Sequence, residues 1–180
     1  MNSHIKNNKI ALIVALLSIN TLVFAQAVNQ TANVSAVVLE PLALSVFDAV
    51  DFGNIQVGST PVLNPVTGAG TDVGTVNSIA YFTLTGSNGA AVSVSYDATV
   101  TLGDGGSNTM TFTPNLVGHA TTQSSATAIA NGSNTTTLGA SGFTFWLGGT
   151  LGTLTGQATG TYSSSASNGS GDFTLTIEYY

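Results

Sequence analysis

The chain has 180 residues, and its only Lys or Arg side chains are Lys6 and Lys9. All eight Asp and Glu side chains follow them, so the chain beyond Lys9 has a formal charge of −8. Without basic side chains this part offers no patch for nucleic acid or for an anionic membrane surface. The absence of Cys also excludes disulfides and thiol chemistry.

The first 25 residues have the features of a secretory signal peptide. Lys6 and Lys9 form a positive n-region, and an apolar run over residues 10–24 ends at small residues, Ala25 and Ala27. We expect cleavage after Ala25, with Ala27 as the alternative, which leaves residues 26–180 as a single domain. The apolar run is shorter than the ~20 residues of a membrane span, so we expect export without membrane insertion. An uncleaved N-terminal anchor is the alternative interpretation.

Beyond the signal peptide, apolar residues recur with a period of two, which is typical of β-strands. They occupy even positions from Val28 to Val46, with a break at Pro41. Short runs rich in β-branched and aromatic residues predict further strands between Gly-rich turns. These runs cover residues 79–85, 91–96, 99–102, 109–113, 143–147 and 173–179. Short strands at this spacing, without a convincing helix, predict an all-β fold of the immunoglobulin-like β-sandwich type.

Two of the turns predict β-hairpins, one at residues 86–89 and one at residues 103–108, because Gly and Asn favour tight reversals. Residues 114–137 are rich in Ser, Thr, Ala and Asn. They predict a long surface loop that contains at most a weak strand.

Few residues could carry catalysis. His119 is the one His after the signal peptide, and no Gly-x-Ser-x-Gly motif accompanies it. Asp48 and Asp51 are the closest carboxylate pair, but on a strand they would point to opposite faces. Asp104 lies in a Gly-rich loop that lacks the spacing of a calcium loop, so a hairpin turn is the preferred interpretation. We therefore expect no enzyme activity, no catalytic residue, no metal site and no cofactor.

Both ends of the domain are alternating strands, which suggests an assembly function. The inward-facing positions are Val28, Ala32, Val34, Ala36 and Val38 near the N-terminus, and Phe173, Leu175, Ile177 and Tyr179 near the C-terminus. A free strand over residues 28–40 can add to the sheet edge of a neighbouring molecule, and head-to-tail repetition makes a fibre. Alternatively, residues 34–46 are simply the first strand of the protein's own sandwich, and residues 173–179 are its last.

Several segments, in this order, resemble a family of secreted bacterial proteins, the domain-of-unknown-function 4402 family. They are residues 36–42, 51–55, 81–86, 89–90, 138–142, 148–151 and 157–163, followed by the terminal strand that ends in Tyr. The resemblance implies a pilin-like β-sandwich, similar to chaperone–usher fimbrial subunits, in which an N-terminal segment completes the next subunit. Residues 31–41 resemble such a donor strand, and Tyr179 resembles the penultimate Tyr of those subunits. The chain departs from that pattern in its lack of a disulfide, in Ser167 where a Gly is common, and in an insert over residues 164–172.

The leading hypothesis is a structural subunit of an extracellular fimbria or surface polymer that self-associates by β-strand donation. Such assembly implies a periplasmic chaperone and an outer-membrane usher as partners. A monomeric secreted β-sandwich that binds a ligand or coats the surface is the alternative. A small outer-membrane β-barrel is disfavoured, because the predicted strands are shorter than the 9–11 residues that a span needs.

Overall fold

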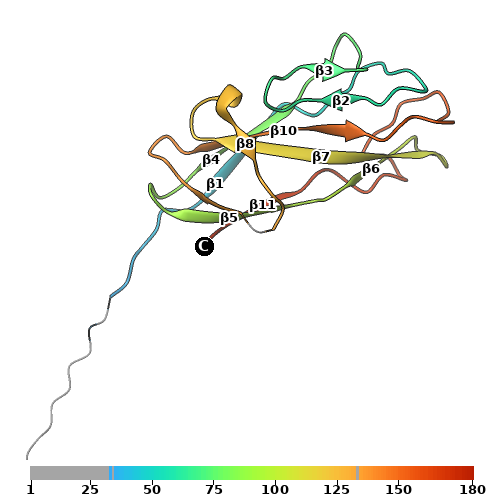
Figure 1. Cartoon of the computed structure of the whole chain (residues 1–180). Helices are drawn as coiled ribbons and strands as arrows, with labels where there is room; N and C mark the ends of the chain where they lie inside the picture. Colours follow the sequence, from blue (N-terminus) through green and yellow to red (C-terminus); the bar gives the residue numbers. More distant parts are fainter. Residues whose placement is uncertain (1–32, 34, 133) are drawn as a thin grey trace, which may run out of the picture. The chain divides into compact units, whose positions relative to one another are not determined.

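The computed structural model describes residues 33, 35–132 and 134–180. The strands in this part of the chain belong to the unit Val38–Tyr180 and form two antiparallel sheets that resemble a sandwich (Figure 1). The elements are β1 (Ala43–Phe47), β2 (Val62–Leu63), β3 (Gly70–Thr71), β4 (Ala80–Thr85), β5 (Ala91–Tyr96), β6 (Val100–Gly103), β7 (Thr109–His119), the 3-10 turn η1 (Gln123–Ser125), β8 (Thr127–Ala128), β9 (Asn134–Thr137), β10 (Phe143–Leu151) and β11 (Leu175–Tyr179). The prediction of an all-β fold is confirmed.

The larger sheet is built around β10. The first half of β10 pairs with β4, which carries β1 on its far side, and the second half pairs with β2, which carries β3. The opposite edge of β10 pairs with β7, and β7 pairs in turn with β6 and β8. The smaller sheet has the order β11-β5-β9. The larger sheet therefore has eight strands and the smaller sheet has three.

The hydrophobic core lies between the sheets, because alternate residues of each strand face inward. Phe145 of β10 and Leu84 of β4 are 0% and 1% exposed, and Val92 and Val94 of β5 are 0% and 1% exposed. These residues belong to one cluster that contains side chains from both sheets. With no Lys or Arg in this unit, apolar burial at ~25 cal/mol per Å² and backbone hydrogen bonds are the main stabilising terms.

One of the two predicted hairpins is wrong. β4 and β5 belong to different sheets, so residues 86–89 connect the two sheets instead of closing a hairpin. Gly89 has φ +80° and supplies the reversal, but both edges of β4 are occupied by β1 and β10. The other hairpin is confirmed, since β6 and β7 pair from Val100↔Phe112 to Gly103↔Thr109.

The prediction of a long loop over residues 114–137 is also wrong. Strand β7 continues through Pro114 to His119, and η1, β8 and β9 follow. Pro114 is tolerated because β6 pairs only up to Phe112 and β8 pairs only from Val117, so no described strand pairs with the edge of β7 between them. The predicted strand over residues 143–147 is confirmed and extends to Leu151.

Among the described residues of the N-terminal alternating segment, Ala43–Phe47 form a strand. Residues 33 and 35–42 have no strand assignment, and residues 28–32 and 34 lie outside the described residues. Within the described part of the chain, no helix is long and apolar enough to cross a membrane.

Candidate functional site: an open edge between β1 and β11

Strands β1 and β11 are the edge strands on one side of the sandwich. Among the described residues, β1 pairs only with β4, and β11 pairs only with β5. Each strand therefore has one edge without a strand partner in this part of the chain. An edge strand presents a row of backbone N–H and C=O groups that can pair with another strand.

The inner face of β1 is exposed although its register places it over the core. Leu44 lies opposite Leu84, and Val46 lies opposite Phe82, so both side chains are on the core side of the sheet. Leu84 is 1% exposed, whereas Leu44 and Val46 are 40% and 64% exposed. Because the smaller sheet ends at β11, no described strand covers these residues. Among the described strands, the smaller sheet therefore leaves the inner face of β1 uncovered on this side.

The inner face of β11 forms the other side of the opening. Ile177 and Tyr179 lie opposite the core residues Val94 and Val92. All four C-terminal residues singled out from the sequence are half-buried and pack against the core: Phe173, Leu175, Ile177 and Tyr179. Phe173 lies just before the strand, which begins at Leu175. We call the opening between β1 and β11 the edge groove.

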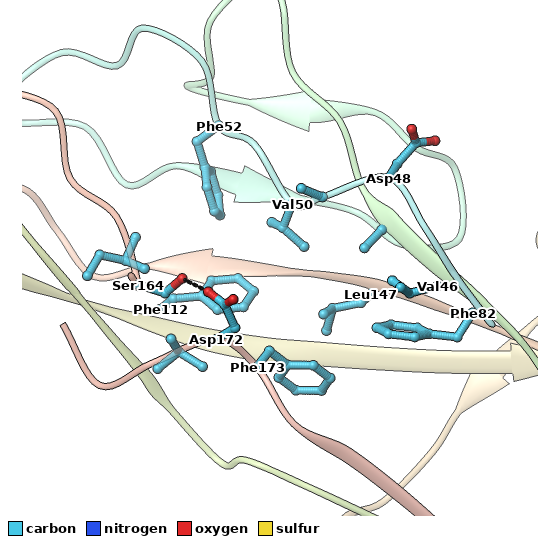
Figure 2. Close-up of a pocket in the computed structure, with 14 residues that line it drawn as sticks. Val46, Asp48, Val50, Phe52, Phe82, Phe112, Leu147, Ser164, Asp172 and Phe173 are labelled. Carbon is cyan, nitrogen blue, oxygen red and sulfur yellow. Dashed lines mark hydrogen bonds between the residues drawn. The ribbon is translucent and has the colours of Figure 1, made fainter. Parts of the chain in front are cut away.

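A pocket of about 290 Å³ forms one end of the edge groove (Figure 2). Val46 lines it from β1 and Phe173 from the approach to β11, and core side chains such as Phe82, Phe112 and Leu147 line it from the larger sheet. Its polar groups are Asp48, Ser164 and Asp172, and the Ser164 hydroxyl donates a hydrogen bond to Asp172 Oδ1 at 2.6 Å (Figure 2). The remaining lining residues are Ala49, Val50, Phe52, Ala80, Val100 and Leu102. A pocket with such walls suits apolar side chains.

Three hydrogen bonds close the other end of the edge groove. The Tyr179 hydroxyl donates to the Glu40 carbonyl at 2.6 Å and accepts from the Ser87 N–H at 2.9 Å. The Glu40 N–H donates to Ser87 Oγ at 2.5 Å. We call this arrangement the Tyr179 clasp, because it joins the end of β11, the β4–β5 connection and the segment before β1.

The predicted donor residues form no strand in the part of the chain that the structure describes. Val28, Ala32 and Val34 lie outside the described residues. Ala36 and Val38 are described, are exposed and belong to no strand, and Val38 is 94% exposed. Their role as a donor strand therefore stays a prediction.

The residues considered for catalysis or metal binding have structural partners. His119 ends β7, and its Nδ1 accepts hydrogen bonds from the Thr121 and Thr122 N–H groups at 3.1 Å each. Among the described residues, no group of three or more His, Cys, Asp or Glu side chains could hold a metal ion. Asp48, with φ +57°, and Asp51 lie beyond the end of β1, so the argument from strand geometry does not apply to this pair.

Asp104 stabilises the loop between β6 and β7. Its Oδ1 accepts from the Gly106 N–H at 2.7 Å, and its Oδ2 accepts from Asn108 Nδ2 at 2.6 Å. Asn168 Nδ2 also reaches Oδ1, at 3.3 Å, and connects the loop to the insert. Hydrogen bonds from the Asn108 side chain and the Gly106 backbone lower the pKa of Asp104 below its usual value of 3.8. These bonds match the role of a turn residue.

Sequence reasoning missed four residues of this site: Leu44, Val46, Glu40 and Ser87. The alternation that continues to Val46 was a signal for Leu44 and Val46, but alternation cannot show which inner face is left uncovered. The clasp had no signal in the sequence, because Glu40 contributes only its backbone and lies far along the chain from Tyr179.

The family comparison covers nearly the whole chain. No curated protein matches the chain. A family model described as "Domain of unknown function (DUF4402)" matches residues 17–179, which include every described strand. The chain therefore belongs to the DUF4402 family.

Proposed function

We propose that this protein is a structural subunit of an extracellular fimbria or similar surface polymer, assembled by β-strand donation. Residues 28–38 of one copy, the donor segment, belong to the predicted donor strand over residues 28–40 and fill the edge groove of the next copy. The observation that carries the proposal is the exposure of Leu44 and Val46 on the inner face of an edge strand, with no described strand opposite them. The role is structural and not catalytic.

The pattern of the donor segment fits the missing strand. Its apolar residues alternate, so that on a strand they face one side, toward the core side chains of β1 and β11. Its polar residues, such as Asn33 and Ser35, then face the solvent. The donor segment and the edge groove are different surfaces of one chain, so the contact is head-to-tail and does not close on itself in general. Repetition of such a contact gives a fibre.

The cellular setting follows from the expected signal peptide. Export through the periplasm brings the subunit to the cell surface. A periplasmic chaperone that covers the edge groove and an outer-membrane usher are the partners that the resemblance to fimbrial subunits implies. Such a chaperone would protect an exposed edge strand from unspecific pairing before assembly.

The test compares two valines of similar exposure. Val46 in the edge groove is 64% exposed, and Val57 in a loop that does not line the pocket is 60% exposed. Neither Val46→Asp nor Val57→Asp should unfold the isolated subunit, but only Val46→Asp places a charge in the assembled interface. We expect Val46→Asp to abolish the heat-sensitive ladder in SDS-PAGE without boiling and the fibres in negative-stain microscopy. Val57→Asp should leave both intact, and normal polymer from Val46→Asp would disprove the proposal.

The second candidate is a self-contained secreted monomer that binds a ligand or coats the surface. The observation in its favour is that Ala43–Phe47 already serves as a strand of the protein's own larger sheet. This candidate predicts that a chain without the residues up to Ala32 remains a folded monomer and that the wild-type protein forms no ladder.

A further inference from the structure

The position of Glu40 decides how the donor segment can reach an edge groove. Glu40 lies at the Tyr179 end of the groove, where the clasp holds it, and β1 runs from there toward the pocket at Val46. Strand β11 runs in the opposite direction, from Phe173 at the pocket to Tyr179. A donor segment that filled the groove of its own copy would therefore have to reverse direction close to Glu40.

The local sequence is poorly suited to that reversal. Tight turns favour Gly, Asn or Asp at positions with positive φ, or a Pro at the second turn position. The residues before Glu40 are Val37, Val38 and Leu39, and β-branched residues are strained at positive φ. Pro41 is the one residue here that favours a turn, and a turn with Pro41 in the second position begins at Glu40 and can use the Glu40 carbonyl as its hydrogen-bond acceptor.

The clasp competes with such a turn because it uses both polar groups of the Glu40 backbone. The N–H is bonded to Ser87 Oγ, and the C=O is bonded to the Tyr179 hydroxyl. Gly86 makes the arrangement possible, since a Cβ at that position would lie 2.6 Å from the Tyr179 hydroxyl oxygen and 2.9 Å from a methyl group of Leu42. A larger residue at position 86 would displace the hydroxyl from Glu40.

We propose that Tyr179 is a positioning residue that keeps the donor segment out of the groove of its own copy and thereby reserves the groove for a second copy of this chain. This inference rests on the proposed strand donation. The clasp closes one end of the groove, so the donor segment of the second copy is received from the pocket end. The clasp thus determines whether the chain forms a self-completed monomer or a polymer.

The test uses the absence of Cys from the chain, which makes two introduced thiols unique. Ser35 belongs to the polar positions of the donor segment, and Thr176 is an exposed residue of β11, so both face the solvent when the donor segment lies beside β11. The full-length exported protein with Ser35→Cys and Thr176→Cys is treated with a short bis-maleimide and boiled in SDS. Links between copies give a ladder, and links within a copy give a monomer band of altered mobility.

In this double-Cys parent we expect mainly the ladder. Adding Tyr179→Phe should raise the ratio of internally linked monomer to ladder about fivefold, which corresponds to the loss of about 1 kcal/mol from one hydrogen bond. Ser87→Ala should act in the same direction, since it removes the acceptor of the Glu40 N–H. The matched control is Tyr162→Phe, which removes a Tyr hydroxyl bond to the Ala158 carbonyl at 3.0 Å and should leave the ratio unchanged.

Three results would overturn the inference. A ladder in Tyr179→Phe equal to that in Tyr162→Phe would show that the clasp does not control assembly, while strand donation itself would stand. Internally linked monomers in the parent would show that the clasp fails to exclude the protein's own donor segment. Unlinked monomers in the parent would disprove the strand donation on which the inference rests.

Discussion

Replacing Val46 by Ala measures whether the inner face of β1 is open. Removing two methyl groups from a fully buried Val costs about 1.6 kcal/mol at about 0.8 kcal/mol per CH₂ group, and a residual cavity adds to this. Val92 on β5 is 0% exposed, so Val92→Ala should destabilise the domain by roughly 2–3 kcal/mol. Val46 is 64% exposed, so only about a third of its side chain is buried. Val46→Ala should therefore cost about a third of 1.6 kcal/mol, or about 0.6 kcal/mol.

A donated strand should raise the cost of Val46→Ala and leave the cost of Val92→Ala unchanged. When a donor strand covers Val46, its side chain becomes buried, and the cost of Val46→Ala should rise to about 1.6 kcal/mol. The assay is urea unfolding of a chain that starts at Leu39, with and without a peptide of residues 26–38. The midpoint and slope of each transition give the free energy of unfolding. The peptide should also raise the stability of the unsubstituted chain by about 2.7 kcal/mol at a hundred times its Kd.

Two outcomes would refute the reasoning. If Val46→Ala costs as much as Val92→Ala without the peptide, the inner face of β1 is already covered. If the peptide stabilises the chain but leaves the cost of Val46→Ala unchanged, it binds at a surface other than the edge groove.

Three further predictions concern the clasp, the Asp104 loop and processing. Gly86→Ala should destabilise the protein by about 1–3 kcal/mol in urea unfolding, because the new methyl group overlaps the Tyr179 hydroxyl; an unchanged midpoint would contradict this. Hydrogen bonds to Asn108 and Gly106 lower the pKa of Asp104 in the folded state. The stability that these bonds add to the folded state is therefore present above about pH 3.8 and is lost as the pH falls through the lowered pKa. Asp104→Asn should therefore lose less stability than wild type between pH 5 and pH 2, as measured by thermal unfolding. Intact-mass analysis of the exported protein should give the mass of a chain that begins after Ala25, and retention of residues 1–25 would contradict the signal-peptide interpretation.

Local patterns in the sequence predicted many of the strands. Alternation with turn signals at both ends gave β4, β5, β6, β10 and β11 to within a few residues. These predictions worked because the period of two and the Gly-rich turns act over short distances along the chain. Pairing is different, because it depends on strands that are distant in sequence. Residues 86–89 have the composition of a hairpin turn, yet the chain crosses there from one sheet to the other.

The composition of residues 114–137 misled the prediction for a related reason. Ser, Thr and Asn are common in loops, but Leu116, Val117 and Ile129 are buried once β7 pairs with β10. The edge groove was partly predictable, since Phe173, Leu175, Ile177 and Tyr179 alternate visibly. The exposure of Leu44 and Val46 follows from the unequal width of the two sheets, which no local pattern encodes.

The direct continuation of the donor segment into β1 has a mechanical consequence. In a filament of strand-linked copies, tension would pass from the donor segment through Glu40 and along the axis of β1. Strand β1 is held to β4 by five antiparallel residue pairs, whose hydrogen bonds are perpendicular to the strand. A pull along the strand axis shears these bonds together, instead of opening them one after another. Such a filament would resist stretching more than peeling, and the β1–β4 pair would determine the force at which a subunit yields.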